Sequence, residues 1–289
     1  MKKNRLSIAL ATFNEEKNIA ECLKSVQDIA DEIVIIDGSS ADKTVEISKS
    51  FGATVEVTDN PPIFHINKQK ALEKSTGEWI LQLDADERVT KQLAEEIMKV
   101  INMNDKELES YQQDLKNRRL FLRHQKLIEE RDGIIGIKDN SIVAFFIPRL
   151  NYFLGRYLKY GGVYPDGVIR LVKKGKAYFP CISVHEQIAV EGRVGWLQND
   201  LIHMADPTFK RYLERNSRYI NLMVNEFKKS RVSKNPLQFF NYFFVKPIWW
   251  FLLTQIRHKG ILDGIPGLIF SFFSALRFPR AYFRYLKSL

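Results

Sequence analysis

The chain has 289 residues, of which 45% are hydrophobic and 27% charged, which favours a packed core and argues against global disorder. The net charge of +10 is concentrated at one end. Residues 228–289 carry eleven Lys or Arg and a single acid, Asp263, whereas the preceding 227 residues are neutral. A nucleic-acid-binding protein with an evenly basic body would not show this distribution, so we expect no nucleic-acid partner.

Residues 6–103 alternate between strand and helix patterns. The first apolar run, Leu6 to Thr12, is short and lacks a cleavage-like site, so it predicts a strand rather than a signal peptide. Strand patterns follow at 32–37, 53–57 and 78–83, and helical patterns lie at 15–29, 41–51 and 68–75. This alternation predicts an α/β fold with a doubly wound, mostly parallel sheet.

Acids stand at the carboxyl ends of two of these predicted strands. Asp37 ends the strand at 32–37, and Asp84 follows the strand at 78–83. Because ligands of doubly wound sheets bind beyond the carboxyl ends of the strands, both acids are candidate site residues.

The strongest local signal is the D-x-D sequence Asp84-Ala85-Asp86. Two acids separated by one residue direct their carboxylates to the same side of an extended chain. Mg²⁺ or Mn²⁺ is commonly held by one or two carboxylates together with substrate phosphates, and such an ion neutralises charge on a diphosphate leaving group. The alternative is an acidic turn at the end of a strand.

Two other polar segments follow predicted strands. The Gly-Ser-Ser sequence after Asp37 suits hydrogen bonding to a base or ribose, although Ser39 or Ser40 could equally cap a helix. The segment from Thr12 to Glu16 follows the first strand, and its Asn14 could likewise be only a helix cap.

The rest of the chain has a different composition. Residues 105–140 are charged and Gln-rich with apolar residues at helical spacing, which predicts a long exposed helix or a pair of helices. Short strand patterns occupy 142–205, and a helical pattern occupies 212–227. We therefore expect one domain over 1–227, with 105–140 as a helical insert, and a basic, aromatic-rich helical region over 228–289.

Combined, the N-terminal motifs resemble family 2 glycosyltransferases, which have the GT-A fold. The matching segments are T-F-N-E-E-x-N-I, V-I-I-D-G-S-S-x-D-x-T and G-E-W-I-L-x-L-D-A-D-E. Later segments, including I-P-R-L-N-Y-F-L-G, G-G-V-Y-P-D, V-H-E and L-I-H, are similar to the lipopolysaccharide inner-core β-1,4-glucosyltransferase subgroup. The insert at 105–140 departs from that subgroup. We expect it to form a helical projection that contacts the acceptor or a partner rather than the donor, so that its deletion spares donor hydrolysis; the alternative is a solvated helix.

The resemblance implies a role for five residues on the nucleotide side of the site. Thr12, Asn14 and Glu15 would line the nucleotide pocket. Asp37 would bind the base or ribose, and Lys68 would reach toward the nucleotide.

The resemblance also implies a metal and phosphate side. Asp84 would face the ribose or the metal, and Asp86 would bind Mg²⁺ or Mn²⁺. His203 could complete the metal or diphosphate site, although a buried structural histidine is an equal alternative. Arg170 could pair with a phosphate.

The catalytic base is expected at Glu186, where such enzymes place it. An inverting transfer needs a carboxylate on the acceptor side to take the hydroxyl proton. Glu186 follows an apolar strand pattern, so it can face a cleft. His185 is the rival base, and a surface acid at a strand end is the plain structural alternative.

The sequence therefore predicts an inverting, metal-dependent glycosyltransferase. Its donor would be a nucleotide diphospho-sugar, with a UDP-sugar favoured, and its acceptor a lipopolysaccharide core or another lipid-linked glycan. A polyprenyl-phosphate glycosyltransferase is the alternative within the class, and a non-catalytic membrane adaptor is an alternative outside it. A nucleotidyltransferase is disfavoured because the segment from Thr12 to Glu15 is not a Gly-rich, basic loop.

The C-terminal region predicts contact with a membrane. Arg277, Arg280, Arg284 and Lys287 share one helical face opposite aromatic residues, a pattern typical of helices that lie among anionic headgroups. The apolar stretch 236–256 is interrupted at Lys246-Pro247, where we expect a break, and the stretch 264–276 is shorter than the roughly 20 residues of a membrane span. We expect peripheral binding at the cytoplasmic face of the bacterial inner membrane. The alternative is a packed helix pair with a solvated basic edge.

Overall fold

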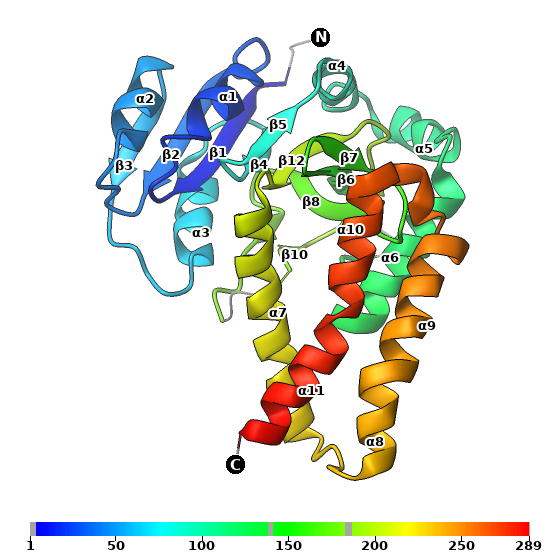
Figure 1. The fold of residues 1–289 in the computed structure, drawn as a ribbon. Coiled ribbons are helices and arrows are strands. Elements are labelled where there is room, and N and C mark those ends of the chain that lie inside the picture. The colour runs from blue at the N-terminus through cyan, green and yellow to red at the C-terminus, as the bar shows by residue number, and fades with distance from the viewer. Residues whose placement is uncertain (1–3, 138–140, 183–186, 289) are drawn as a thin grey trace. The chain divides into compact units, whose positions relative to one another are not determined.

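The computed structural model describes residues 4–137, 141–182 and 187–288 (Figure 1). Contacts divide the chain into two units, residues 1–149 with 165–203, and residues 150–164 with 204–289. This division differs from the expected boundary after residue 227. Helix α7 (Phe209–Lys229) belongs to the second unit because its apolar residues pack against the C-terminal helices.

The main sheet combines parallel and antiparallel strand pairs. The strand order is β3 (Thr54–Val57), β2 (Glu32–Asp37), β1 (Leu6–Thr12), β4 (Trp79–Leu83), β8 (Asp166–Lys173), β6 (Ile142–Phe153), β12 (Leu201–Asp206) and β5 (Glu87–Val89). Strand β1 pairs in parallel with β2 and β4, and β2 pairs in parallel with β3, whereas β8 pairs antiparallel with β4 and β6, and β12 pairs antiparallel with β5. The expected mostly parallel α/β architecture is confirmed for the part of the sheet that carries the N-terminal motifs.

Shorter strands complete the first unit. Strand β11 (Arg193–Trp196) pairs with β6, and β9 (Ala177–Tyr178) pairs with β10 (Ala189–Val190) in a small separate sheet. In the second unit, β7 (Arg156–Leu158) forms a hairpin with the end of β6.

Two apolar cores cover the faces of the sheet. Along β1, Leu6, Ile8 and Leu10 lie in one core and Ala9 in the other, as the alternation of side chains along a strand requires. The first core includes residues of α1 (Ile19–Lys24) and α4 (Lys91–Val100), and the second includes residues of α3 (His65–Lys74). Helix α2 (Thr44–Ser50) lies between β2 and β3 in the chain.

One predicted helix is shorter than expected. The pattern over 15–29 predicted a helix along its whole length, but α1 ends at Lys24. The hydroxyl of Ser25 donates a hydrogen bond to the carbonyl oxygen of Cys22, and turns follow up to Ile29. A serine that bonds back to the backbone competes with helical hydrogen bonds in this way.

The insert forms a helical pair, as predicted, but it is not an exposed projection. Helices α5 (Asp105–Gln113) and α6 (Arg118–Asp132) bury Leu108, Phe121 and Ile128 in the two cores. The Phe121 ring stacks on the Trp196 indole of β11 with centroids 4.7 Å apart. These buried side chains anchor the insert to the sheet.

The second unit is a group of long helices. After α7, the chain is helical without interruption over 236–257, and it then forms η3, α10 and α11. The segments of the uninterrupted stretch are α8 (Pro236–Phe240), η1 (Asn241–Val245), α9 (Lys246–Leu252) and η2 (Leu253–Arg257), and those after it are η3 (Gly260–Asp263), α10 (Gly264–Ala275) and α11 (Arg277–Lys287).

The break expected at Lys246-Pro247 is absent. The helix passes through these residues, with π-helical turns before and after α9. A proline lacks the amide hydrogen that a regular α-helix uses, and local π-turns are a known way of rearranging the backbone hydrogen bonds around such a position.

Candidate active site

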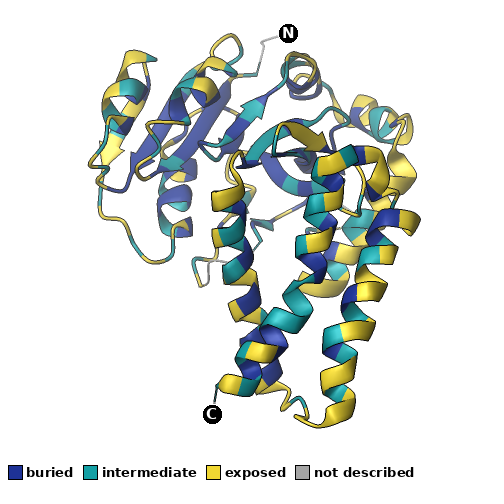
Figure 2. Cartoon of the chain, viewed as in Figure 1, coloured by how far each residue is buried: buried dark blue, intermediate teal, exposed yellow. Residues whose placement is uncertain are grey.

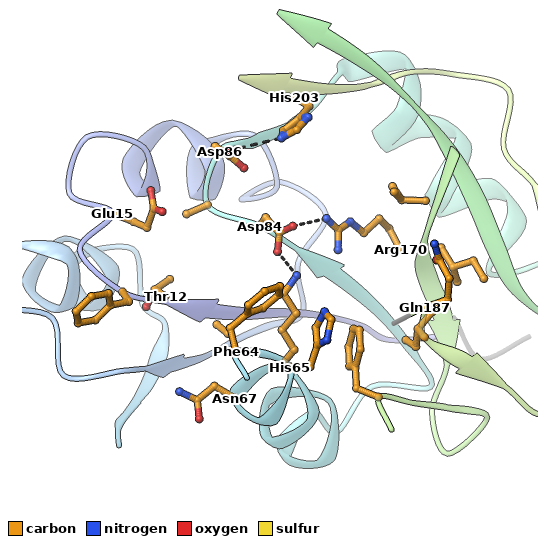
Figure 3. Close-up of a pocket in the computed structure, with 18 of the residues that line it drawn as sticks. Thr12, Glu15, Phe64, His65, Asn67, Asp84, Asp86, Arg170, Gln187 and His203 are labelled. Atoms are coloured by element: carbon orange, nitrogen blue, oxygen red, sulfur yellow. Dashed lines mark hydrogen bonds and ion pairs between the residues drawn. The ribbon is translucent and has the colours of Figure 1, made fainter. Parts of the chain in front are cut away.

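A cavity of about 540 Å³ opens in the first unit, next to the carboxyl ends of β1 and β4 (Figure 3). Helix α3 and the antiparallel strands β6, β8 and β12 supply further walls. Seven of the predicted site residues line it, namely Thr12, Glu15, Lys68, Asp84, Asp86, Arg170 and His203. The topology thus brings residues from five separate segments of the chain to one place.

The first acid of the D-x-D sequence, Asp84, is held by two bases. Lys68 Nζ of helix α3 lies 2.5 Å from Oδ1, and the Arg170 guanidinium of β8 donates a hydrogen bond to Oδ2. Burial raises the pKa of Asp84, but Arg170 and Lys68 outweigh it and hold that pKa well below the usual range. Asp84 is therefore ionised, with both carboxylate oxygens already engaged by cations.

The partners of Asp84 are themselves buried. Burial lowers the pKa of the Lys68 ammonium, and the nearby Asp84 carboxylate opposes that change. Arg170 Nη2 donates a second hydrogen bond, 2.8 Å long, to the fully buried Glu87. Burial lowers the pKa of Arg170, and Asp84 and Glu87 together raise it above its usual value.

Arg149 extends this network along β6. Its guanidinium lies 2.7 Å from Asp166 and 3.6 Å from Glu87. The buried Nε groups of Arg149 and Arg170 have no hydrogen-bond partner among the described residues. The cavity wall therefore contains guanidinium groups that are fixed in position but not saturated, as an anion site requires.

The second acid, Asp86, directly precedes β5 and faces His203 on the paired strand β12. Strand β5 pairs antiparallel with β12, and this register places His203 opposite Glu87, the residue next to Asp86. His203 Nε2 lies 3.7 Å from Asp86 Oδ2, and both side chains line the cavity (Figure 3). A carboxylate and an imidazole are thus presented to the same space.

These two side chains fit a divalent cation only in part. Within the residues that the structure describes, no three His, Cys, Asp or Glu side chains are grouped as a metal site. Carboxylate oxygen suits Mg²⁺ and Mn²⁺, which ordinarily complete their coordination with substrate phosphates and water. Asp86 and His203 are compatible with a metal of this kind that is bound together with a diphosphate.

Two of the predicted nucleotide-site residues do not line the cavity. Asp37 is fully buried, and its carboxylate accepts hydrogen bonds from the Thr12 hydroxyl and from the Ser40 backbone and hydroxyl. The Asn14 side chain accepts a hydrogen bond, 2.9 Å long, from the backbone of Ala41. Both residues join the loops after β1 and β2, so direct contact of either one with a nucleotide stays a prediction.

An aromatic wall was missed in the sequence. Phe64 and His65 lie one helical turn before Lys68, and the His65 ring stacks on Phe179 with centroids 4.9 Å apart. Phe13 and Phe64 are each more than 40% exposed although they are large apolar side chains. Phe64 and His65 lie four and three residues before Lys68, and residues at this spacing share a helix face. This spacing was the sequence signal that could have placed the two rings beside Lys68.

The predicted base, Glu186, and its rival His185 lie outside the described residues. Gln187, the next described residue, lines the cavity together with Ile188. Its side-chain amide donates a hydrogen bond, 3.2 Å long, to Asp132 at the end of α6. Asp132 is the last residue of α6 and belongs to the insert, so the insert contacts a residue of the cavity wall.

The sequence is similar to those of known glycosyltransferases. The model of glycosyl transferase family 2 matches residues 7–174, which is more than half of the chain. The lipopolysaccharide core biosynthesis glycosyltransferase LpsC of Rhizobium meliloti is 25% identical over 290 residues, covering 94% of this chain and 91% of the relative. An uncharacterized glycosyltransferase of Rickettsia bellii is 38% identical over 94 residues, which are 32% of this chain and 31% of that relative.

Among solved structures, the glucosyl-3-phosphoglycerate synthase of Mycobacterium tuberculosis, in complex with Mn²⁺, UDP and glucosyl-3-phosphoglycerate, is similar over 29% of this chain and 34% of that chain. The identity is 22% and the TM-score 0.27, which is too low for a residue-by-residue correspondence. The family match, in contrast, contains the D-x-D sequence and the strand ends around the cavity. The chain belongs to glycosyl transferase family 2.

Proposed function

We propose that this enzyme is an inverting, metal-dependent glycosyltransferase that moves a sugar from a UDP-sugar to a lipopolysaccharide core or another lipid-linked glycan. The observation that carries the proposal is the cavity itself. It places Asp86 and His203 in the same space as the buried cations Lys68 and Arg170. Carboxylate, imidazole and fixed cations are the groups that hold a metal–diphosphate pair.

The roles divide by chemistry. Asp86 and His203 would hold Mg²⁺ or Mn²⁺, which when bound neutralises charge on the departing diphosphate. Arg149 and Arg170 contribute positive charge whose position is fixed by Glu87 and, for Arg170, by Asp84. Because these groups are held before the donor arrives, they need little rearrangement as charge develops on the leaving group.

The aromatic wall is suited to the nucleoside part of the donor. Exposed rings at Phe13 and Phe64 offer flat apolar surfaces on which a base can stack. Thr12 also lines the cavity, and its hydroxyl is oriented by a 2.7 Å hydrogen bond that it donates to Asp37. In this proposal Asp37 acts on the nucleotide through Thr12 rather than by direct contact.

The proton of the acceptor hydroxyl would pass to Glu186. In an inverting transfer, the oxygen of the acceptor attacks the anomeric carbon as the bond to the diphosphate breaks, and a carboxylate takes the hydroxyl proton. The position of Gln187 in the cavity wall supports a base at the neighbouring residue. His185 is the competing candidate.

The acceptor class rests on the similarity to LpsC, which extends over 94% of this chain. An acceptor carried by a membrane lipid fits a peripheral location at the cytoplasmic face of a bacterial inner membrane, and the basic C-terminal region fits an anionic membrane surface.

The test is a transfer assay with radiolabelled UDP-sugars and two kinds of acceptor, a truncated lipopolysaccharide core and a polyprenyl phosphate. The proposal predicts that label moves to the lipopolysaccharide core, with inverted configuration at the anomeric carbon. Label found only on polyprenyl phosphate would contradict the proposed acceptor, and retained configuration would contradict the single displacement.

A further inference from the structure

The helical stretch 236–257 exposes one apolar side. Leu237, Phe240, Phe244, Ile248, Leu252 and Ile256 recur every three or four residues, and each is more than 40% exposed. Such spacing places side chains along one side of a helix. The residues buried on this stretch include the polar Thr254 and Gln255.

Helix α10 and the turn before it repeat this arrangement. Ile261, Ile265, Leu268 and Phe272 are exposed, whereas Gly267, Ser271 and Ser274 are buried (Figure 2). Large apolar side chains therefore face outward and small or polar ones face inward. Water-soluble helices have the opposite polarity.

The buried polar residues join the two helices to each other. Gln255 donates hydrogen bonds to the Ser271 hydroxyl, 2.6 Å away, and to the Gly267 carbonyl, 3.2 Å away. The Trp250 indole donates a 3.0 Å hydrogen bond to the Ser274 hydroxyl. Small residues at the interface and polar side chains that bond across it are typical of helices packed in lipid.

The charges around the exposed apolar side chains indicate which kind of partner covers them. Among the described residues of 230–288 the single acid, Asp263, is buried and accepts hydrogen bonds from the backbone of Lys159 and Tyr160. Exposed bases stand before the apolar stretch, at Arg231 and Lys234, and after it, at Arg257 and Lys259. An apolar surface bounded by cations and free of exposed acids matches an anionic bilayer, in which acyl chains lie beneath negative headgroups.

We propose that the helical stretch 236–257 and helix α10 form a monotopic surface, which inserts their exposed apolar side chains into one leaflet of an anionic membrane. The inference refines the membrane part of the proposed function, and it does not depend on the transferase reaction. It also moves the contact away from α11, where the sequence predicted it.

Helix α11 packs against α7, which covers its aromatic face. Tyr282 and Tyr285 of α11 are buried in a core with Phe227 of α7, so the predicted aromatic face is not exposed. On its basic face, Arg277 and Arg284 donate hydrogen bonds to Asn216 and Asn221 of α7 respectively.

The same packing argues against a membrane span. The described stretch Gly260–Lys287 is long and apolar enough to cross a bilayer by length and composition, which is weak support by itself. Its C-terminal half packs on α7, which carries charged residues along its length, including Lys210, Glu214 and Glu226. A span would draw these charges into the acyl region, whereas insertion of one face leaves them in water.

Flotation with vesicles tests the surface. The double variant Phe244→Asp with Ile248→Asp changes exposed residues and should lower the lipid partition coefficient for phosphatidylcholine–phosphatidylglycerol vesicles by at least about a hundredfold. The matched control, Leu120→Asp with Leu127→Asp, changes two exposed apolar residues of α6 and should float like the wild type. The double variant Arg280→Gln with Lys287→Gln in α11 should lower the partition coefficient much less than the Phe244/Ile248 double variant does.

Other outcomes overturn the inference. The Phe244/Ile248 variant could float like the wild type, or binding could depend on α11 alone. The wild type could also be a dimer in solution that this variant makes monomeric, which would assign the surface to a second copy. Circular dichroism and UDP-sugar hydrolysis without lipid should be unchanged in this variant. Loss of flotation with intact hydrolysis separates failure of membrane binding from failure of the enzyme.

Trp249 offers a second readout. It is 63% exposed beside Ile248, whereas Trp250 is 36% exposed with its indole bonded to Ser274, and Trp79 and Trp196 are buried. Brominated lipids should quench the fluorescence of the vesicle-bound wild type, and Trp249→Phe should remove most of this quenching. Vesicle-bound protein whose fluorescence is not quenched would show that the surface does not enter the leaflet.

Discussion

Lys68 Nζ lies 2.5 Å from Oδ1 of Asp84, so the ionised first acid of the D-x-D sequence is paired with a cation from helix α3. Asp86, two residues later, instead faces His203. The two acids look equivalent in the sequence, and the fold gives them different surroundings. We infer that Asp84 holds the cationic wall in place, and we propose that Asp86 binds the metal.

The first prediction follows from the buried partners of Asp84. Asp84→Asn should lower the free energy of unfolding by about 1–3 kcal/mol, because Lys68 and Arg170 keep their burial but lose a charged partner. Urea denaturation measures this change. Asp86→Asn is the matched control and should stay within about 0.5 kcal/mol of the wild type. Equal losses in both variants would contradict the division of roles.

The second prediction concerns pH. The folded-state pKa of Asp84 lies well below its ordinary value of 3.8, so its ionised form stabilises the fold. That stabilisation is complete above the unfolded pKa and is lost only as the pH falls through the lower folded pKa. The difference in unfolding free energy between wild type and Asp84→Asn should therefore stay constant from neutral pH down to about pH 4. A difference that already shrinks between about pH 7 and 5 would show that Asp84 is not held in this way.

The third prediction concerns the catalytic base. Glu186→Gln keeps the shape of the side chain but cannot accept a proton, so kcat should fall roughly 10²–10⁴-fold with little change in donor KM. Steady-state kinetics with a saturating acceptor measure both values. His185→Ala is the comparison variant. If it is inactive while Glu186→Gln is nearly normal, the neighbouring histidine is the base.

The fourth prediction concerns the helical insert. Phe121 is fully buried and stacks on Trp196, so Phe121→Ala should destabilise the fold by about 3–5 kcal/mol. Leu122→Ala changes the next residue, which is 47% exposed, and should cost less than about 0.5 kcal/mol. Thermal unfolding would compare them, and similar values for the two would show that the insert does not pack on the sheet.

This packing changes how the insert can be studied. The sequence predicted that 105–140 contacts acceptor or a partner, and that its deletion would spare donor hydrolysis. Deletion would in fact expose Trp196 and remove Phe121 from the core, so loss of activity would report unfolding. Substitution of Asp132, which accepts the hydrogen bond from Gln187, is a sharper way to test whether the insert affects transfer.

The sequence was informative where local patterns determine position. Parallel strands end at one edge of a sheet, so the segments after β1 and β4 could be expected near each other from their alternation with helices. Asp86 and His203 come together because β5 pairs antiparallel with β12, and no hydrophobic periodicity in the sequence predicts that pairing. The same limit applies to Arg149 and Asp166, which meet because β6 pairs with β8.

Helix periodicity predicts which residues share a face, but it does not identify what that face contacts. The pattern of α11 correctly predicted an amphipathic helix, but a pattern does not say whether its aromatic face meets lipid or protein. The structure buries Tyr282 and Tyr285 against α7 and leaves the apolar residues of α10 exposed. Only the packing partners, which lie far away in the sequence, distinguish these two outcomes.

UDP release from a panel of UDP-sugars, measured with Mn²⁺, Mg²⁺ or EDTA for the wild type, Asp86→Asn and His203→Gln, tests whether this site works with a metal. We expect the wild type to turn over one UDP-sugar only when a divalent cation is present. Asp86→Asn should lose about 10²–10³-fold in rate, the equivalent of several kcal/mol of charge stabilisation, while its stability stays normal. Undiminished turnover by Asp86→Asn in EDTA would show that Asp86 holds no metal that the reaction needs.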